Sequence, residues 1–255
     1  MSFVKRLNNN YKYTLIMDNK KSLGVIVPFY NEELFLTDSV KRLLEIEIAQ
    51  EIVLVDDCST DNSFILAKNI VNKNKNIKLI KTEENKGKGA AVKKGLELIS
   101  TSHVIIHDAD LEYFPEDIPE MFSMIPNNEK SLILGTRTAG TKKRINLYFY
   151  TYFGNKILSM IFSVLNAYRV SDIASCYWLV KSDDLRKINI SEKGFAIEVE
   201  VLSKFLRNKF NIIEVPIKYH ARSYEDGKKI KIKDGFKIFI KILKYCKLNI
   251  FLKAY

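Results

Sequence analysis

Short apolar segments alternate with amphipathic segments through the first half of this chain, and this alternation restricts its fold more than any other feature. Apolar runs rich in β-branched residues predict strands at 23–27, 51–55, 77–81, 104–106 and 131–134. Apolar residues at helical spacing predict helices at 34–44, 61–73, 89–99 and 118–125. Strands that alternate with helices form βαβ units. We therefore predict an α/β fold with a mostly parallel central sheet flanked by helices.

The second half of the chain has a less regular pattern. The stretch 146–165 is rich in large apolar residues and holds one charge, Lys156, which predicts one or two helices that are apolar nearly all round. Further strands are predicted at 176–181 and 212–215, and a helix at 197–208. A last helix at 234–248 carries a stripe of lysines beside large apolar side chains, namely Lys237, Lys241, Lys244 and Lys247.

Polar motifs follow three of the predicted strands. Tyr30-Asn31-Glu32 follows the first strand, Asp56-Asp57 the second, and Asp108-Ala109-Asp110 the fourth. Ligands of open parallel sheets bind beyond the carboxyl ends of the strands, which lie along one edge. We therefore expect these carboxylates to converge on one site.

The Asp108-x-Asp110 motif is the strongest candidate for a metal site. Two carboxylates two residues apart at a strand end can both reach one divalent cation, and Glu112 adds a third acid nearby. Mg²⁺ and Mn²⁺ prefer such oxygen ligands and also bridge phosphate oxygens. A cation here would neutralise charge on a departing nucleoside diphosphate. The alternative interpretation is a solvated acidic turn.

A second acidic cluster, Asp56-Asp57 with Ser59-Thr60-Asp61, follows the second strand. It is suited to hold a uracil or guanine base and its ribose. Asp61 also has the residue type and position of an N-cap for the helix that follows, and the two roles are compatible.

The segment Asn85-Lys86-Gly87-Lys88-Gly89 is a glycine-rich basic loop before a helix. Its backbone N–H groups, with Lys86 and Lys88, would be able to approach a diphosphate. The loop lacks the spacing G-x-x-x-x-G-K-[ST], which disfavours a P-loop kinase. A plain turn is the alternative.

A second basic element follows Pro216. Arg222, Lys228 and Lys229 lie in a polar, glycine-containing stretch. A flexible basic loop near the strand ends would be able to close over phosphates. The alternative is a solvated charged loop.

The net charge of +11 lies in the two ends of the chain. Residues 1–21 carry five Lys/Arg and one Asp, and residues 218–255 carry eleven Lys/Arg and three acids. Basic ends suit a polyanion, and because no nucleic-acid-binding signature is present we favour a membrane surface over nucleic acid. A merely solubilising charge is the alternative. No run of 18 apolar residues occurs, so no membrane span is predicted.

Taken together, these motifs resemble those of the family 2 glycosyltransferases of GT-A fold, in order and in spacing, over about residues 22–138. The matching pieces are 27–32 (VPFYNE), 55–61 (VDDCSTD), 85–90 (NKGKGA), 108–112 (DADLE) and 135–137 (GTR). The second half resembles the polyprenyl-phosphate branch, the dolichol-phosphate mannose synthase-like enzymes. That match is carried by Ser171-Asp172, Glu198, Glu200, 215–217 (VPI) and 219–229 (YHARSYEDGKK).

The resemblance implies a role for each motif. The nucleotide would be lined by Pro28, Tyr30, Glu32 and Asp57. The metal would be held by Asp108, Asp110 and Glu112. The phosphates would face Arg137, Arg222 and Lys228, with Asp110 and Arg222 as the catalytic residues. An acceptor phosphate would meet Arg144 and Thr151, which correspond to an Arg and a Ser of the mannose synthases, whereas Trp178 stands where a basic residue is expected.

The function predicted from these features is inverting transfer of a hexose from a nucleoside-diphosphate sugar to a polyprenyl phosphate, with Mg²⁺ or Mn²⁺. A phosphate acceptor is already anionic near neutral pH and needs positioning rather than a general base. Transfer to a sugar or protein hydroxyl is the main alternative, and it would need a base such as Asp172, which otherwise reads as a helix cap. A nucleotidyltransferase and an inactive membrane-bound nucleotide-sugar sensor are two further alternatives.

The chain is expected to divide into an N-terminal extension at 1–21, a catalytic domain at 22–225 and a basic amphipathic helix at 226–255. Three cysteines, Cys58, Cys176 and Cys246, favour a reducing compartment over a disulfide framework. We therefore predict a cytoplasmic protein peripherally associated with a membrane. Its predicted partners are a nucleotide-sugar donor, a lipid-phosphate acceptor and the membrane surface, or a membrane-embedded partner subunit, but no nucleic acid.

Overall fold

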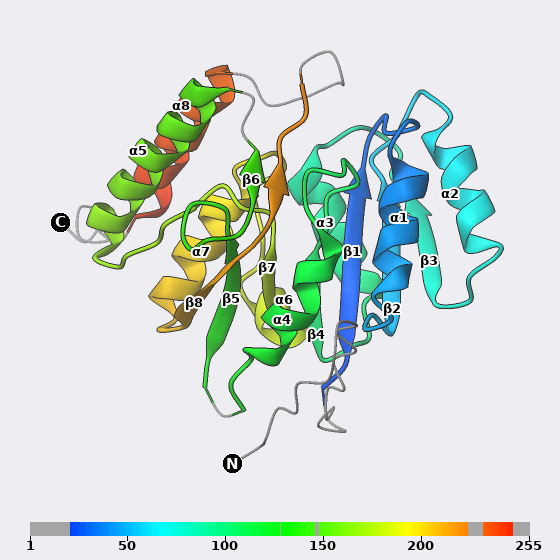
Figure 1. Ribbon diagram of the computed structural model, residues 1–255, viewed down its shortest axis with the longest axis horizontal. Coiled ribbons are helices and arrows are strands. Elements are labelled where there is room, and N and C mark those ends of the chain that lie inside the picture. The colour runs from blue at the N-terminus through cyan, green and yellow to red at the C-terminus, as the bar shows by residue number, and fades with distance from the viewer. Residues whose placement is uncertain (1–20, 128, 146–147, 224–231, 247–255) are drawn as a thin grey trace.

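The computed structural model describes residues 21–127, 129–145, 148–223 and 232–246. A seven-stranded sheet runs through the molecule in the order β3-β2-β1-β4-β7-β5-β8 (Figure 1). Its strands are β1 (Leu23–Phe29), β2 (Glu51–Asp56), β3 (Ile77–Lys81), β4 (His103–Ile106), β5 (Ser131–Thr136), β7 (Trp178–Lys181) and β8 (Asn211–Pro216). β7 pairs antiparallel with both β4 and β5, and the other pairs are parallel. The predicted α/β fold with a mostly parallel sheet is therefore confirmed.

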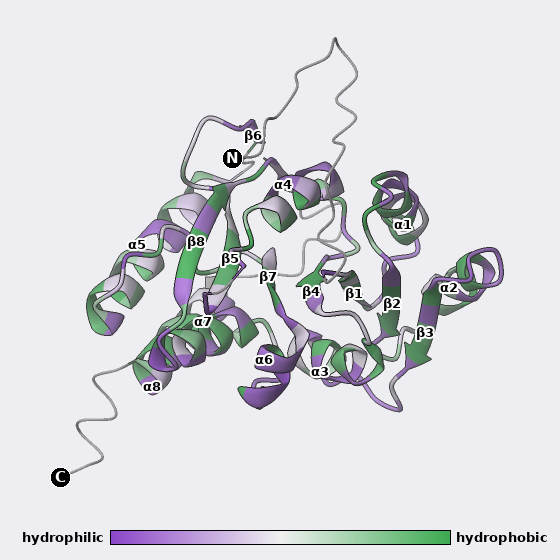
Figure 2. Cartoon of the chain, turned by 90° about the horizontal axis from the view of Figure 1, so that it is seen from below, coloured by the Kyte–Doolittle hydropathy of each residue, from purple (hydrophilic) through white to green (hydrophobic). Residues whose placement is uncertain are grey.

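Helices cover both faces of this sheet (Figure 2). The bounds are α1 (Leu36–Glu45), α2 (Ser63–Val71), α3 (Lys88–Leu98), α4 (Ile118–Ser123), α5 (Phe149–Asn166), α6 (Ser182–Lys187), α7 (Ile197–Arg207) and α8 (Ile232–Tyr245). Successive side chains of a strand point to opposite faces, and the core is split accordingly. Val25 and Val27 pack in a cluster with α1, α2 and α4, whereas Ile26 packs in a second cluster with α3, α6, α7 and α8.

The central strands are buried along their whole length, which explains why they lack alternating polarity. Every residue of β1, β2 and β4 is buried. A strand covered by helices on both sides reads as a continuous apolar run. The carboxyl ends of these three strands carry Tyr30, Asp57 and Asp108, and the sheet therefore brings the three predicted motifs to one edge.

Several element boundaries differ from those predicted. The predicted one or two helices of 146–165 correspond to a single helix, α5, in the described part of that stretch. The second helix begins at Ser63, with Asn62 at its N-cap position, although Asp61 Oδ1 does accept the Ser63 N–H at 2.9 Å. The strand predicted from 176 begins at Trp178, because the chain first turns between Cys176 and Trp178.

A second, two-stranded sheet was not predicted. It pairs β6 (Arg144–Ile145) with β9 (Tyr219–His220). The His220 N–H also donates to the Glu112 carbonyl at 2.9 Å. This small sheet ties the chain that leads into α5 to the segment that ends at Arg222. Two-residue strands carry too little periodicity to be recognised from sequence.

No helix in the described ranges is both long enough and apolar enough to span a membrane. The predicted N-terminal extension lies almost entirely outside the described residues, and so do Lys228, Lys229 and Lys247.

Candidate active site

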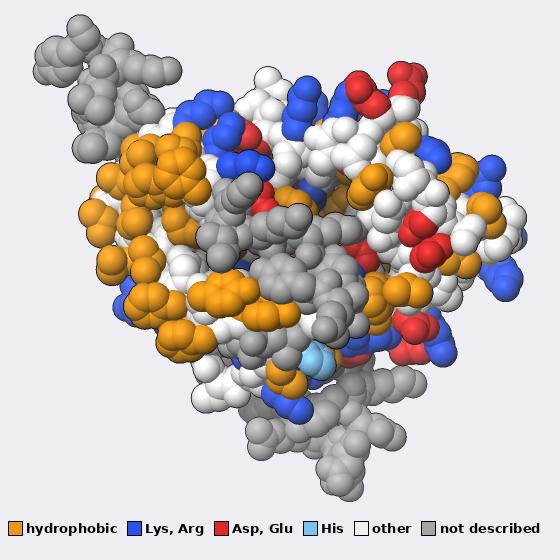
Figure 3. All heavy atoms as spheres, turned by 90° about the horizontal axis from the view of Figure 1, so that it is seen from above, with side chains coloured by type: hydrophobic (Ala, Val, Ile, Leu, Met, Phe, Trp, Pro, Cys, Tyr) orange, Lys and Arg blue, Asp and Glu red, His pale blue; other side chains and the backbone are white. Residues whose placement is uncertain are grey.

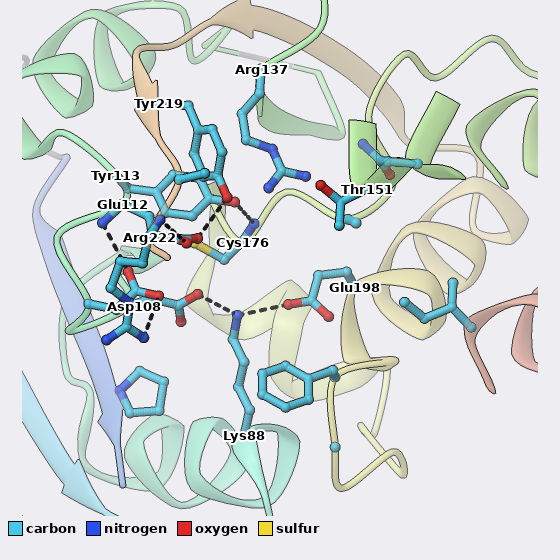
Figure 4. A pocket seen from close by; sticks show the side chains of 18 of the residues that line it. Lys88, Asp108, Glu112, Tyr113, Arg137, Thr151, Cys176, Glu198, Tyr219 and Arg222 are labelled. Carbon is cyan, nitrogen blue, oxygen red and sulfur yellow. Dashed lines mark hydrogen bonds and ion pairs between the residues drawn. The ribbon is translucent and has the colours of Figure 1, made fainter. Parts of the chain in front are cut away.

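A cavity of about 730 Å³ opens at the carboxyl edge of the sheet. Its walls come from the ends of β1, β2 and β4, from α3, α5, α7 and α8, and from the segment after β9 (Figure 4). Most of the predicted site residues line it, namely Pro28, Tyr30, Glu32, Asp57, Lys88, Asp108, Asp110, Glu112, Arg137, Arg144, Thr151 and Arg222.

Lys88 lies at the centre of this cavity. Its Nζ donates to Asp108 Oδ2 at 2.9 Å and to Glu198 Oε1 at 2.8 Å, as Figure 4 shows. Burial acts against its charge, but the two carboxylates outweigh it and hold the pKa of Lys88 well above its usual value. The ammonium therefore stays charged between the end of β4 and α7.

Glu198 is a cavity residue for which the sequence predicted no role. It lies on α7, lines the cavity and is 5% exposed. Its Oε2 atom is buried and has no hydrogen-bond partner. A buried acceptor without a donor costs free energy, so this atom is suited to accept a hydrogen bond from a bound ligand.

Arg222 follows β9 and reaches back across the cavity. Its Nη1 donates to Glu32 Oε2 at 2.9 Å, and its Nη2 lies 3.4 Å from Asp110 Oδ2. Glu112 fixes this segment, because its two carboxylate oxygens accept the Arg222 N–H at 2.8 Å and the Tyr219 hydroxyl at 2.7 Å. The guanidinium therefore lies against the acidic cluster instead of in a solvated loop.

The predicted ligand set fits a divalent cation in donor type and in charge. Six carboxyl groups line the cavity against four cationic side chains. Burial, together with Glu112 and Asp108, raises the pKa of Asp110 to about 8. A hard cation would relieve this repulsion through the oxygen ligands that it prefers.

The three predicted carboxylates do not form a ready-made cage. Within the described ranges no group of three His, Cys, Asp or Glu side chains is arranged to hold a metal ion. Both oxygens of Glu112 accept hydrogen bonds from Tyr219 and Arg222, so its geometry is that of a residue that holds β9 in place. Asp108 and Asp110 are the carboxylates best placed to hold a cation.

The glycine-rich loop does not direct its backbone N–H groups into the cavity as the sequence predicted. The N–H groups of Lys86 and Gly87 donate to Asp57 at 3.1 and 2.6 Å, so these donors are not directed at a diphosphate. The Lys86 side chain is outside the cavity wall and pairs with Glu84 at 2.8 Å. Gly87 has a φ of +91°, and a Cβ at this position would lie 2.8 Å from the Lys193 carbonyl oxygen. Close packing on the 192–193 segment explains this glycine.

Arg137 lies at the end of the cavity next to α5. Its Nε donates to Asp172 Oδ2 and its Nη2 to Asp172 Oδ1, both at 2.8 Å. Asn155 of α5 donates to the same carboxylate at 2.7 Å. Burial opposes the charge of Asp172, but Arg137 outweighs it and lowers the pKa of Asp172 to about 2. This low pKa makes Asp172 a poor general base, and Asp172 lies between α5 and β7 rather than at the start of a helix.

A second guanidinium lies beside the first. Arg144 donates from Nη1 to the Arg137 carbonyl oxygen at 2.7 Å and stacks on the Tyr152 ring, 4.5 Å from its centroid. Thr151 lines the same end of the cavity and donates to the Tyr148 carbonyl oxygen at 2.8 Å. The two arginines and Thr151 thus gather where the cavity meets α5, although the resemblance grouped Arg137 with the residues that face the donor phosphates.

The fold and the site together define a class of protein. Solved structures of glucosyl-3-phosphoglycerate synthase from Mycobacterium tuberculosis superpose with a TM-score of 0.66 at 18% identity, over 89% of this chain and 81% of theirs. One of them contains UDP, and another contains Mn²⁺, UDP and glucosyl-3-phosphoglycerate. The fold is the nucleotide-diphospho-sugar transferase, or GT-A, fold.

The sequence identifies the family. Residues 24–188 match the profile of glycosyl transferase family 2, and the chain belongs to that family. A UDP-N-acetylglucosamine–dolichyl-phosphate N-acetylglucosaminyltransferase of Methanococcus voltae is 31% identical over 88% of this chain and 95% of its own length. A dolichol-phosphate mannosyltransferase of Pyrococcus furiosus is 28% identical over 81% of this chain and 58% of its own length. The resemblance to the polyprenyl-phosphate branch is confirmed.

Proposed function

We propose that this protein transfers a hexose, with inversion, from a nucleoside-diphosphate sugar to a polyprenyl phosphate of the dolichyl type. One observation carries the acceptor assignment: the guanidinium groups of Arg137 and Arg144 line the end of the cavity that meets the apolar helix α5. A guanidinium presents a fork of N–H donors that matches the oxygens of a phosphate. The two relatives named above act on dolichyl or dolichol phosphate, which supports the same acceptor class.

We assign the nucleotide-sugar donor to the opposite end of the cavity from α5. The nucleotide would lie against Pro28, Tyr30, Glu32 and Asp57, where β1 and β2 end. The hexose would then lie near Lys88, with Glu198 Oε2 accepting a hydrogen bond from one of its hydroxyls. This places the reacting carbon between the acidic cluster and the two arginines.

Asp108 and Asp110 would hold Mg²⁺ or Mn²⁺, and the cation would supply positive charge to the diphosphate oxygens. Arg222 adds a second positive charge next to Asp110. The leaving diphosphate gains charge as its bond to the sugar breaks, so fixed cations at that end stabilise the transition state. Lys228 remains a predicted phosphate ligand outside the described residues.

A phosphate acceptor also removes the need for a base. Its oxygen is already ionised near neutral pH, so Arg137, Arg144 and Thr151 need only hold it in line with the sugar. Transfer to a hydroxyl would need a basic carboxylate at the same place. The carboxylate closest to these arginines, Asp172, is fully engaged by Arg137, which favours the phosphate.

A donor and acceptor screen tests this function. Purified protein with Mn²⁺ and radiolabelled UDP- or GDP-hexoses is expected to form a labelled lipid when a polyprenyl phosphate is added. Mild acid should release the sugar, because a glycosyl phosphate is more acid-labile than a glycoside. A nucleotide sugar that transfers only to a polyprenol or an oligosaccharide would contradict the proposal, and binding without turnover would favour the sensor.

We also propose peripheral association with the cytoplasmic face of a membrane. α5 exposes a row of large apolar side chains, and Figure 3 shows apolar side chains gathered at this end of the molecule. α8 adds Phe236, Ile240 and Leu243 next to exposed Lys237 and Lys244. The free thiols suit a reducing compartment.

Flotation with anionic vesicles checks the association. The wild type is expected to float at low salt and less at high salt, since each lysine near an anionic surface contributes ~1 kcal/mol. The variant K237Q/K244Q should float several-fold less. The control K94Q/K187Q removes the same charge from α3 and α6 and should float like the wild type. A wild type that stays at the bottom of the gradient would favour a membrane-embedded partner subunit.

A further inference from the structure

Glu200 is a fully buried carboxylate to which the proposed function gives no role. It lies on α7, two residues after Glu198, but outside the cavity wall. Its oxygens accept the N–H of Ser191 at 2.9 and 3.0 Å, the N–H of Glu192 at 2.7 Å and the ammonium of Lys204 at 2.7 Å. One carboxylate therefore fixes the backbone of the segment 191–193, which precedes α7.

The contacts of Glu200 are those of an ionised carboxylate. Burial opposes its charge, but the hydrogen bonds from Lys204 and Ser191 outweigh burial and lower the pKa of Glu200. Hydrogen bonds that an N–H donates to a carboxylate are stronger than those it donates to a neutral acceptor. The segment 191–193 belongs to no helix or strand, so its position depends on contacts of this kind.

The segment 191–193 packs directly on the glycine-rich loop. The Ala90 N–H donates to the Lys193 carbonyl oxygen at 3.2 Å. A Cβ at Gly87 would lie 2.8 Å from the same oxygen, and a Cβ at Gly89 would overlap the Glu192 carbonyl oxygen. Backbone meets backbone here without room for a side chain, and the position of the loop therefore follows that of the segment.

The glycine-rich loop in turn builds the nucleotide end of the cavity. Gly87 and Lys88 line the cavity, and the N–H groups of Lys86 and Gly87 donate to Asp57. Asp57 is one of the residues against which we place the nucleotide. A shift of the loop would therefore move the partners of Asp57 and the Lys88 ammonium together.

We propose that Glu200 is a positioning residue for the nucleotide-sugar donor, and that it acts through the segment 191–193 on the glycine-rich loop. This inference rests on the proposed function, which places the nucleotide against Asp57. Without the carboxylate, two N–H groups of the segment lose their acceptor and the loop loses its fixed support. A loop that has the binding conformation for about a tenth of the time lowers the affinity for the nucleotide about tenfold.

Titration calorimetry with UDP and with GDP in the presence of Mn²⁺ measures this effect without an acceptor and without turnover. For the nucleotide that the wild type binds, Glu200→Ala is expected to raise Kd about tenfold. Glu200→Gln keeps one acceptor oxygen and should raise Kd less. In the transfer assay, the KM of Glu200→Ala for the nucleotide sugar should rise in the same proportion, with a smaller change in kcat and an unchanged KM for the lipid phosphate.

Phe205→Leu is the matched control for a general weakening of α7. The Phe205 ring is fully buried in the last two turns of the helix and packs edge-on against Phe210. Its truncation should lower the unfolding temperature, because it leaves a cavity in the core. The Kd for the nucleotide should stay at the wild-type value, since the hydrogen bonds of Glu200 are intact.

Gly89→Ala tests the same contact from the side of the loop. Residue 89 lies outside the cavity wall, but its new Cβ would displace the Glu192 carbonyl group. This variant should also raise Kd. The double variant Glu200→Ala/Gly89→Ala should bind no more weakly than the weaker single variant, because both changes break one contact. Should Glu200→Ala fail to fold, Glu200→Gln and Gly89→Ala provide the same test.

The outcomes separate the positioning role from the function. Glu200 variants that bind the nucleotide as tightly as the wild type would overturn the positioning role and leave the proposed function intact. The role would also be wrong if Phe205→Leu raised Kd equally, or if the effects of Glu200→Ala and Gly89→Ala were fully additive. A wild type that binds neither UDP nor GDP would contradict the proposed function, and the positioning role with it.

Discussion

Asp110→Asn is expected to lower the transfer rate by about 10³-fold or more. The carboxylate is one of the two that we assign to the cation, and the loss of one preorganised electrostatic contact to a developing charge costs ~10²–10³ in rate. The variant is also expected to be more stable than the wild type without metal. The folded pKa of Asp110 is raised to about 8, so at pH 7 burial and its acidic neighbours oppose its charge. Asp110 therefore costs the wild type no stability below the unfolded pKa of 3.8, and the wild type loses stability as the pH rises through the folded value of about 8, so the advantage of Asp110→Asn should grow with pH.

Initial rates and thermal unfolding, each with and without Mn²⁺, measure both effects. Mn²⁺ should stabilise the wild type but not Asp110→Asn, because a ligand that binds only the folded state raises its stability. Asp183→Asn is the control, since that carboxylate on α6 is 82% exposed and lies away from the cavity. Asp110→Asn with full activity in excess EDTA would show that the metal assignment is wrong.

The fold was predictable from sequence because its main signal is local. The buried strands β1, β2 and β4 are apolar along their length, and the helices between them keep helical spacing. No local pattern in the sequence predicts that β7 runs antiparallel to its neighbours. Its residues Trp178, Leu179 and Val180 are buried and apolar, and this pattern is the same in a parallel and an antiparallel strand.

The site was predictable where it depends on strand ends and not where it depends on distant segments. Asp108 and Asp110 follow β4 directly, so the topology alone places them. The Lys88–Glu198 pair joins residues 110 positions apart, and Arg222–Glu32 joins residues 190 apart. Which helix faces which strand end is set by the packing of the whole domain, and no local pattern encodes it.

The glycine-rich loop shows how one motif can have two physical explanations. A diphosphate cradle and a tight packing contact both need glycine, because both bring a backbone close to another group. The sequence left a diphosphate cradle and a plain turn open. The structure accounts for Gly87 by its contact with Lys193 and directs the loop N–H groups to Asp57. The part of the loop that reaches the cavity centre is the Lys88 side chain.

The buried pair Arg137–Asp172 is expected to control stability as well as acceptor binding. Asp172→Leu should lower the free energy of unfolding by about 3–5 kcal/mol, because it leaves the Arg137 guanidinium largely buried without its counter-ion. In the wild type the folded pKa of Asp172 is about 2. Its contribution to stability is therefore present above the unfolded pKa of 3.8 and is lost as the pH falls through about 2.

Urea unfolding at pH 7 of the wild type, Asp172→Leu and the double variant Arg137→Leu/Asp172→Leu checks this expectation. The double variant should regain most of the lost stability while remaining inactive, since it leaves no charge buried alone but removes the acceptor guanidinium. Below about pH 3 the difference between the wild type and Asp172→Leu should shrink, because protonation weakens the wild-type pair. If the single and double variants are equally unstable at pH 7, the loss comes from packing of the leucine, and the ion pair does not stabilise this end of the cavity.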